Sequence, residues 1–121
     1  MAKKIVENKE LRQQIIKLFT SENIFNNSET DLISEYKRVY GLKPVAMLLN
    51  DEELIRTATL FFENNLNISL ASKCGFMHRN TLIYRLDKIE KQIGLDIRNF
   101  KDAVVFENML LFYNFIKKDL Y

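Results

Sequence analysis

One segment near the middle of the chain, from Asn67 to Ile93, constrains the fold more than any other. Its first part is short and carries small or apolar residues that let another helix approach closely: Leu70, Ala71, Ser72 and Cys74. Its second part repeats apolar residues at spacings of four, three and four: Leu82, Leu86, Ile89 and Ile93. That spacing places one apolar stripe along a helix. The segment therefore predicts two helices separated by a very short turn.

The side of the second helix opposite this stripe is cationic and rich in groups that form hydrogen bonds. It carries Arg79, Asn80, Tyr84, Arg85, Lys88 and Lys91. Arginine can pair twice with guanine and asparagine twice with adenine, and hydroxyl groups reach phosphates or base edges. The first turns of a recognition helix enter the major groove, and Arg79, Asn80 and Thr81 lie there. The pattern favours a helix-turn-helix that reads double-stranded DNA over an amphipathic helix whose polar side is merely solvated.

The residues from His78 to Leu86, HRNTLIYRL, are followed by Ile89-Glu90 and Gly94-Leu95-Asp96. This string resembles the C-terminal helix-turn-helix domain of the PucR/CdaR regulators, which act in bacterial purine catabolism and sugar-diacid use. A more distant likeness is to the Fis type of DNA-binding domain. The resemblance runs from about Asp51 to about Leu111. It departs at the turn, where Phe76 stands at a position that is glycine in many helix-turn-helix proteins and Gly75 comes one place earlier.

The resemblance and the residue pattern together imply a sequence-specific transcriptional regulator whose second motif helix, at about residues 78–92, reads the major groove. The residues expected to contact DNA are His78, Arg79, Asn80, Thr81, Tyr84, Arg85 and Lys88. The alternative is a protein-interaction module that keeps this scaffold but no longer binds DNA. Its support is the modest net charge and the aromatic last helix. Salt-dependent binding to duplex DNA separates the two hypotheses.

Charge is distributed unevenly along the 121 residues. The net charge is only +2, so the total does not by itself indicate a nucleic-acid partner. Residues 65–92, however, hold five basic and two acidic residues, whereas residues 1–64 hold nine and ten. The positive excess therefore lies on the motif, as expected for a surface that faces DNA.

Several classes of function find no support in the sequence. One cysteine and one histidine, Cys74 and His78, cannot build a disulfide or a zinc site. His78 has no nucleophile suitably paired with it, and the three glycines are too scattered for a phosphate-binding loop. We expect no enzymatic activity, no metal and no cofactor, and no small-molecule effector is evident. The chain begins without a signal peptide and lacks a run of ~18 apolar residues, so we expect a cytoplasmic protein without membrane contact.

Helical periodicity predicts an all-α fold, a small bundle of five or six helices that contains the helix-turn-helix. Residues 9–20 form the first helix and the polar stretch 20–27 ends it. Ser28 caps the second helix, Gly41 ends it, and Pro44 opens a short turn through Leu49. Asn50 caps a helix whose apolar side carries Leu54, Ile55, Ala58, Phe61 and Phe62. We expect residues 1–50 to be an N-terminal helical extension packed on the core with a role in dimerisation, and residues 51–121 to be the DNA-binding domain.

The last helix is expected to begin near Asp102, after Gly94 has capped the recognition helix. It is apolar on nearly every face: Val104, Val105, Phe106, Met109, Leu110, Leu111, Phe112, Tyr113, Phe115 and Ile116. One neighbouring helix cannot cover all of them. Two interpretations stay open, a helix buried centrally in the bundle and a subunit interface. Because DNA readers with one short recognition helix usually pair, we expect a homodimer on an inverted repeat.

Overall fold

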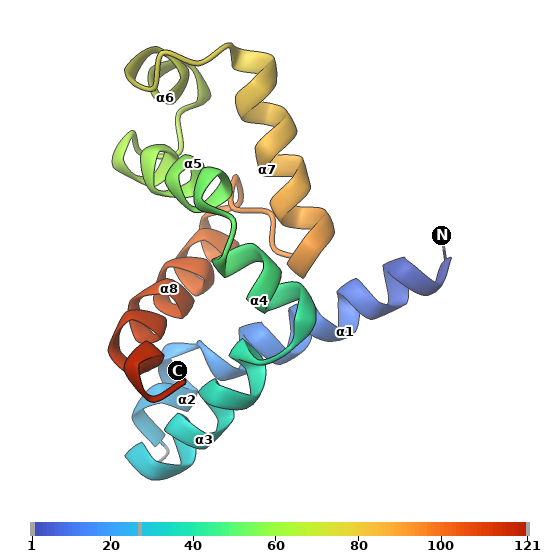
Figure 1. Ribbon diagram of the computed structural model, residues 1–121, viewed down its shortest axis with the longest axis vertical. Helices are drawn as coiled ribbons and strands as arrows, with labels where there is room; N and C mark the ends of the chain where they lie inside the picture. Colours follow the sequence, from blue (N-terminus) through green and yellow to red (C-terminus); the bar gives the residue numbers. More distant parts are fainter. Residues whose placement is uncertain (1, 27, 121) are drawn as a thin grey trace.

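The computed structural model describes residues 2–26 and 28–120, and these form eight helices and no strand. The helices are α1 (Ala2–Leu18), α2 (Ser21–Asn26), α3 (Glu29–Tyr40), α4 (Lys43–Leu49), α5 (Glu52–Glu63), α6 (Ile68–Cys74), α7 (Arg79–Ile93) and α8 (Phe100–Leu120) (Figure 1). The all-α class is confirmed. The expected number of five or six helices is wrong, because two short helices, α2 and α4, occupy segments that were expected to be a break and a turn. Neither exceeds seven residues, which gives periodicity too few turns to act on.

The helix ends follow local capping chemistry, with three shifts from expectation. Ser28 caps α3 and Gly41 ends it, as predicted. At α5 the cap is Asp51 and not Asn50, since Asn50 closes α4 and the Asp51 carboxylate accepts from the Leu54 N–H at 3.2 Å. α8 begins at Phe100, two residues before the predicted Asp102, because the side chain of Asn99 accepts from the Lys101 N–H. The first helix also starts earlier than predicted, at Ala2, and ends at Leu18.

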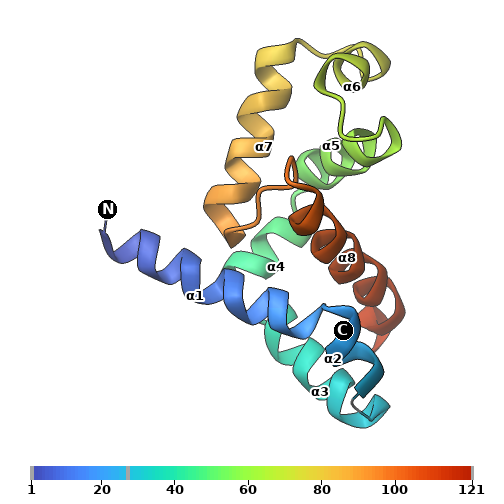
Figure 2. The ribbon, with the colours of Figure 1, turned by 180° about the vertical axis from the view of Figure 1, so that it is seen from behind.

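The helix-turn-helix lies at one end of the molecule, α2 and α3 lie at the other, and α1 runs across the middle (Figures 1 and 2). The four apolar residues of the α7 stripe, Leu82, Leu86, Ile89 and Ile93, are completely buried, as their spacing predicts. The helices α1, α4, α5 and α6 all contact α7. Helices from both halves of the chain therefore share one core around the predicted recognition helix.

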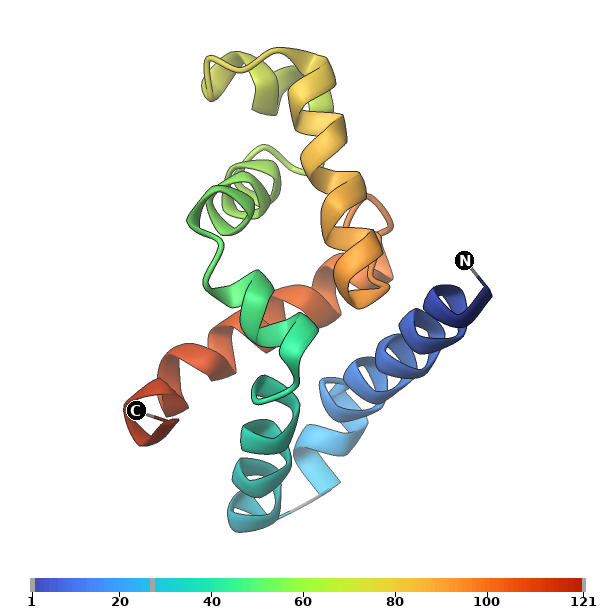
Figure 3. The same cartoon turned by 45° about the vertical axis from the view of Figure 1, so that its right-hand side comes forward.

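Aromatic side chains join α3 and the C-terminal half of α8 beneath the end of α1. Phe19 stacks on Tyr36 with ring centroids 5.1 Å apart, and Tyr36 stacks on Phe112 at 5.2 Å. The Tyr40 hydroxyl donates to the Met109 carbonyl oxygen. In Figure 3, α3 lies below α8. Four large apolar residues elsewhere on α8 are exposed: Phe100, Val104, Leu111 and Phe115.

Although α8 is long and largely apolar, none of the described helices meets the length and hydropathy that a bilayer crossing requires.

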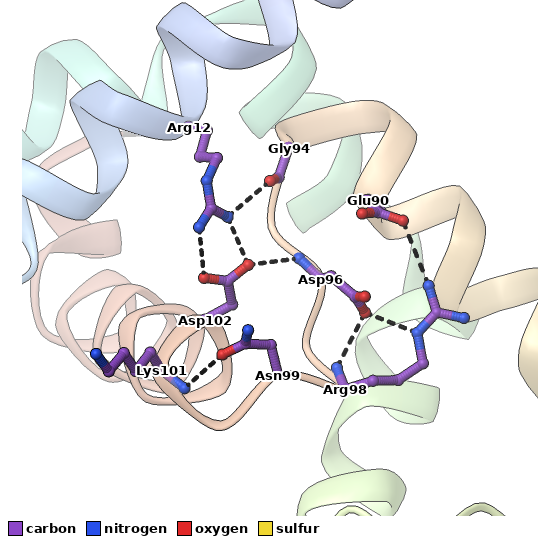
Figure 4. A network of polar contacts seen from close by, with 8 residues as sticks. All are labelled: Arg12, Glu90, Gly94, Asp96, Arg98, Asn99, Lys101 and Asp102. Carbon is purple, nitrogen blue, oxygen red and sulfur yellow. Dashed lines mark hydrogen bonds and ion pairs between the residues drawn. The ribbon is translucent and has the colours of Figure 1, made fainter.

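Polar contacts fasten α1 to the C-terminal end of α7 (Figure 4). Asn8 donates to the Lys91 carbonyl oxygen at 2.7 Å, and Arg12 donates to the Gly94 carbonyl oxygen at 3.0 Å. Arg12 also donates twice to the buried carboxylate of Asp102, which raises the pKa of the guanidinium. Gly94 has a φ of +79°, and a Cβ there would lie 2.6 Å from the Asn8 oxygen. Glycine is therefore needed at this position for its conformation and for the close approach of α1.

Replacing Arg12 by methionine tests the polar link between α1 and α8. The change keeps an aliphatic side chain but leaves the Asp102 carboxylate buried without its cation. We expect a loss of about 1.5–3 kcal/mol in the free energy of unfolding, the range for hydrogen bonds to charged groups. Urea titration followed by circular dichroism measures it. Arg38→Met, at an exposed position of α3, is the matched control and should change stability by less than about 0.5 kcal/mol. Equal effects of the two variants would contradict this role of Arg12.

Candidate nucleic-acid interface

The helix-turn-helix consists of α6, the residues Gly75 to His78, and α7. At the end of α6 the Phe76 N–H donates to the Lys73 carbonyl oxygen at 3.2 Å and the Met77 N–H donates to Ser72 at 2.9 Å. This bond pattern is a Schellman motif, in which the residue at the position of Phe76 is left-handed and usually glycine. Phe76 has a φ of +50°, whereas Gly75 has a φ of −88°. The phenylalanine thus adopts the conformation that glycine adopts in many such turns, at a cost of about 1–2 kcal/mol.

Gly75 has a different task in this turn. A Cβ at Gly75 would collide with the Cδ2 of Leu60 and lie 3.2 Å from the Ala71 carbonyl oxygen. The missing side chain therefore lets the turn lie directly on α5.

On α6, only part of the expected packing face is buried. Ala71 and Ser72 are buried, but Leu70 and Cys74 are exposed, so the expectation was wrong for those two residues.

The first turn of α7 is organised by His78, the residue before the helix. The His78 Nδ1 accepts from the Asn80 N–H at 3.1 Å and so caps the helix. Because Nδ1 accepts, the other ring nitrogen, Nε2, is left to donate to a further group. The side chain is exposed. His78 therefore combines a structural role with a free donor beside the start of α7.

Three of the predicted contact residues are exposed on α7: Arg79, Asn80 and Tyr84. Asn80 and Tyr84 lie on the side away from the buried Leu82 and Leu86. Arg79 stands three residues before Leu82 and so lies near the buried face, at the end of the helix, and the expectation that it lies opposite the stripe is wrong. The Arg79 guanidinium makes one long hydrogen bond, 3.4 Å to the Ser69 hydroxyl of α6. Tyr84 is 66% exposed although its ring is large and apolar. These side chains can reach into a groove without displacing any packed group.

The other predicted residues lie on the flank of α7 that faces α5. Thr81 is half-buried there. Arg85, only 24% exposed, donates to the Thr57 hydroxyl at 3.3 Å and lies 3.6 Å from the Glu53 carboxylate. Lys88 is 3.9 Å from the Asp51 carboxylate. Arg85 is therefore held against α5, and residue spacing alone does not reveal this contact with α5.

A residue that the sequence did not single out, Arg98, controls the charge of the C-terminal half of α7. Its guanidinium lies 2.8 Å from Asp87, 3.3 Å from Glu90 and 2.7 Å from Asp96 (Figure 4 shows the last two contacts). Burial lowers the pKa of Arg98, but its hydrogen bonds to Asp96 and Asp87 outweigh this effect and raise it. Arg98 thereby neutralises acids that would otherwise repel a polyanion. The sequence offered only a lone arginine after Gly94, without a spacing that identifies its partners.

Comparisons with known proteins agree with this geometry. Residues 54–111 match the family model of the PucR C-terminal helix-turn-helix domain. The chain is 38% identical over 77 residues to the uncharacterized protein YxkF of Bacillus subtilis (strain 168), a match that covers 64% of this chain and 23% of that protein. It is 41% identical over 66 residues to the carbohydrate diacid regulator of Escherichia coli (strain K12), covering 52% of this chain and 17% of the regulator.

A further relative is the purine catabolism regulatory protein of Bacillus subtilis (strain 168), 37% identical over 49 residues, which are 40% of this chain and 9% of that protein. The matched part is thus less than a quarter of each of these three relatives. No solved structure matches the chain significantly. The matched family is one of helix-turn-helix domains, and two of these relatives are named as regulators.

Replacing Phe76 by glycine tests whether the turn is strained. The ring is 98% exposed, so its removal loses almost no burial. Relief of about 1–2 kcal/mol of left-handed strain should exceed the entropic cost of glycine, about 0.5–1 kcal/mol. We therefore expect Phe76→Gly to raise the free energy of unfolding slightly. The matched control, Glu35→Gly in the interior of α3, should lower it by about 0.5–1 kcal/mol. A loss of stability in Phe76→Gly, measured by urea titration, would show that the phenylalanine is not strained.

Proposed function

Because residues 54–111 are a PucR C-terminal helix-turn-helix domain, we propose that the chain is a sequence-specific DNA-binding transcriptional regulator whose helix α7 reads the major groove. The observation that carries the proposal is the exposure of Arg79, Asn80 and Tyr84 on a helix whose apolar stripe is completely buried. Two relatives are named as regulators. A bacterial regulator of this kind works beside the chromosome, and the proposal therefore includes a cytoplasmic location.

The proposed roles follow from where each side chain stands. Arg79 and Asn80 contact base edges, since they project from the first turn, which enters deepest. Tyr84, one turn later, contacts a base edge or the sugar. His78, Thr81, Arg85 and Lys88 lie on the rim of α7 and contact the DNA backbone. Backbone contacts set the position of the domain, and base contacts select the sequence.

Alanine substitutions separate the two kinds of contact. Arg79→Ala and Asn80→Ala should each weaken binding to a selected site by about 1–3 kcal/mol and relax the base preference at one position. Lys88→Ala should weaken binding to selected and random duplexes alike. Fluorescence anisotropy titrations with duplexes selected from a random pool measure both effects.

The control is Lys37→Ala on α3, a substitution of an exposed cation remote from α7, which should leave both affinities unchanged. Unaltered binding of Arg79→Ala to a selected site would overturn the assignment of α7 as the recognition helix. If the unchanged protein shows no salt-dependent binding to any duplex, the alternative function, a protein-interaction module on this scaffold, is the correct one.

We also propose that two copies pair through the exposed face of α8. Its four exposed apolar residues are symmetric about the point between Glu107 and Asn108: Phe100 and Phe115 are equally far from it, and so are Val104 and Leu111. Two antiparallel copies of α8 related by a two-fold axis at this point would place Phe100 beside the partner's Phe115. Such a self-complementary face is what a two-fold dimer requires. In this proposal residues 1–50 support the pairing by holding α8 in place through α1 and α3.

A charge at Phe115 tests this pairing. Phe115 is 73% exposed, so Phe115→Glu should keep the fold and yield monomers that bind an inverted repeat weakly. Phe112→Glu is the contrasting variant, because Phe112 stacks on Phe19 and Tyr36 and its replacement should unfold the chain. Sedimentation equilibrium measures the mass, and circular dichroism measures the helicity. A mass of 14.4 kDa for the unchanged protein at high concentration, both free and on a half-site, would exclude the dimer.

A further inference from the structure

A cleft of about 480 Å³ opens between α5 and the turn that precedes α7. Thr57, Leu60 and Gly75 line it, and two guanidinium groups, those of Arg56 from α5 and Arg85 from α7, stand beside it. We propose that this cleft binds a backbone phosphate of the duplex whose major groove α7 enters. The inference rests on the proposed function and extends the DNA interface to α5, a helix outside the helix-turn-helix.

The widths of an α-helix and of the major groove imply that a phosphate would lie beside this cleft. An α-helix with its side chains is about 10–12 Å across, and the major groove is about 12 Å wide. A helix in the groove therefore has a sugar-phosphate backbone along each flank. Thr81 and Arg85 are one turn apart on one flank of α7, next to Asn80 and Tyr84, and both line the cleft. If Asn80 and Tyr84 enter the major groove of a duplex, one sugar-phosphate backbone of that duplex passes the opening of the cleft.

The chemistry of the cleft suits a phosphate. Arg56 is exposed, and within residues 2–26 and 28–120 it makes no hydrogen bond or ion pair. Arg85 is held in position by the Thr57 hydroxyl, so its guanidinium needs little ordering on binding. Arginine forks match the oxygens of a phosphate, and the charge assists both hydrogen bonds. His78 lines the same cleft and can donate through Nε2.

One acidic residue of the cleft, Glu53, opposes the binding of a phosphate. Glu53 lines the cleft, is 71% exposed, and lies 3.6 Å from Arg85, which is beyond the range of a direct hydrogen bond. Its carboxylate weakens the attraction for a phosphate and occupies one side of the Arg85 guanidinium. The proposal therefore makes two predictions of opposite sign, since removing the charge of Arg56 weakens DNA binding and removing the charge of Glu53 strengthens it.

The experiment compares Arg56→Gln, Glu53→Gln and the unchanged protein by anisotropy titration at several salt concentrations. Loss of one phosphate contact should lower the magnitude of the slope of log K against log salt by about 0.9. Arg56→Gln should therefore bind selected and random duplexes roughly five- to tenfold more weakly at 0.1 M salt, with base preference unchanged. Glu53→Gln should bind both more tightly. Arg38→Gln, which removes an exposed charge on α3, is the matched control and should leave the slope unchanged.

The outcomes distinguish this inference from the function on which it rests. If the unchanged protein binds a selected duplex but Arg56→Gln has the same salt slope, the cleft takes no phosphate and the inference is overturned, while the proposed function stands. If Arg56→Gln changes base preference and not the slope, Arg56 contacts a base and the phosphate assignment is wrong. If no duplex binds the unchanged protein, both proposals fail. Circular dichroism of each variant verifies the fold.

Discussion

Burial of the apolar stripe on α7 is the interaction on which the rest of the structure depends. Leu82, Leu86, Ile89 and Ile93 are completely removed from water, and each such side chain contributes about 1.5–3 kcal/mol. The stripe is covered by α1, α4, α5 and α6, helices that all precede it in the sequence, at near and distant positions. Because one side of α7 is fixed in this way, the opposite side must face the solvent in a single orientation. Side chains on it are thus presented without further ordering of the backbone, which favours specific recognition.

Electrostatic pairing around α7 reconciles a modest net charge with the proposed DNA-binding surface. Arg98 neutralises Asp87 and Glu90, and Arg12 neutralises the buried Asp102. Several acids of the domain are thus compensated locally, while Arg56, Arg79 and Lys91 remain exposed to solvent. Since an approaching polyanion responds to the nearby field and not to the total charge, the arrangement matters more than the value of +2.

Two residues of the turn before α7, Gly75 and Phe76, occupy sterically restricted positions. Gly75 has no side chain where Leu60 of α5 lies close, and Phe76 accepts a left-handed backbone that a phenylalanine seldom adopts. The ring of Phe76 gains almost nothing in return, because it is 98% exposed. A residue whose backbone is strained and whose side chain is not buried gains little stability, and such residues cluster at binding sites. Both residues border the cleft between α5 and α7 that we propose as a phosphate site.

The sequence by itself determined the helix-turn-helix, the buried stripe of α7, its end at Gly94 and the all-α class, because these depend on residues within four positions of one another. The choice of Asp51 over Asn50 as the cap of α5 is local, but the pattern left it ambiguous, since Asn50 closes the preceding helix. Only the tertiary structure decided that Arg85 faces α5, that Arg98 pairs with the acids of α7, and that Phe112 is packed while Phe115 is exposed. The physical reason is that a helical period fixes which side chains share a face, whereas the partner of each face comes from distant segments, as Arg12 and Asp102 do.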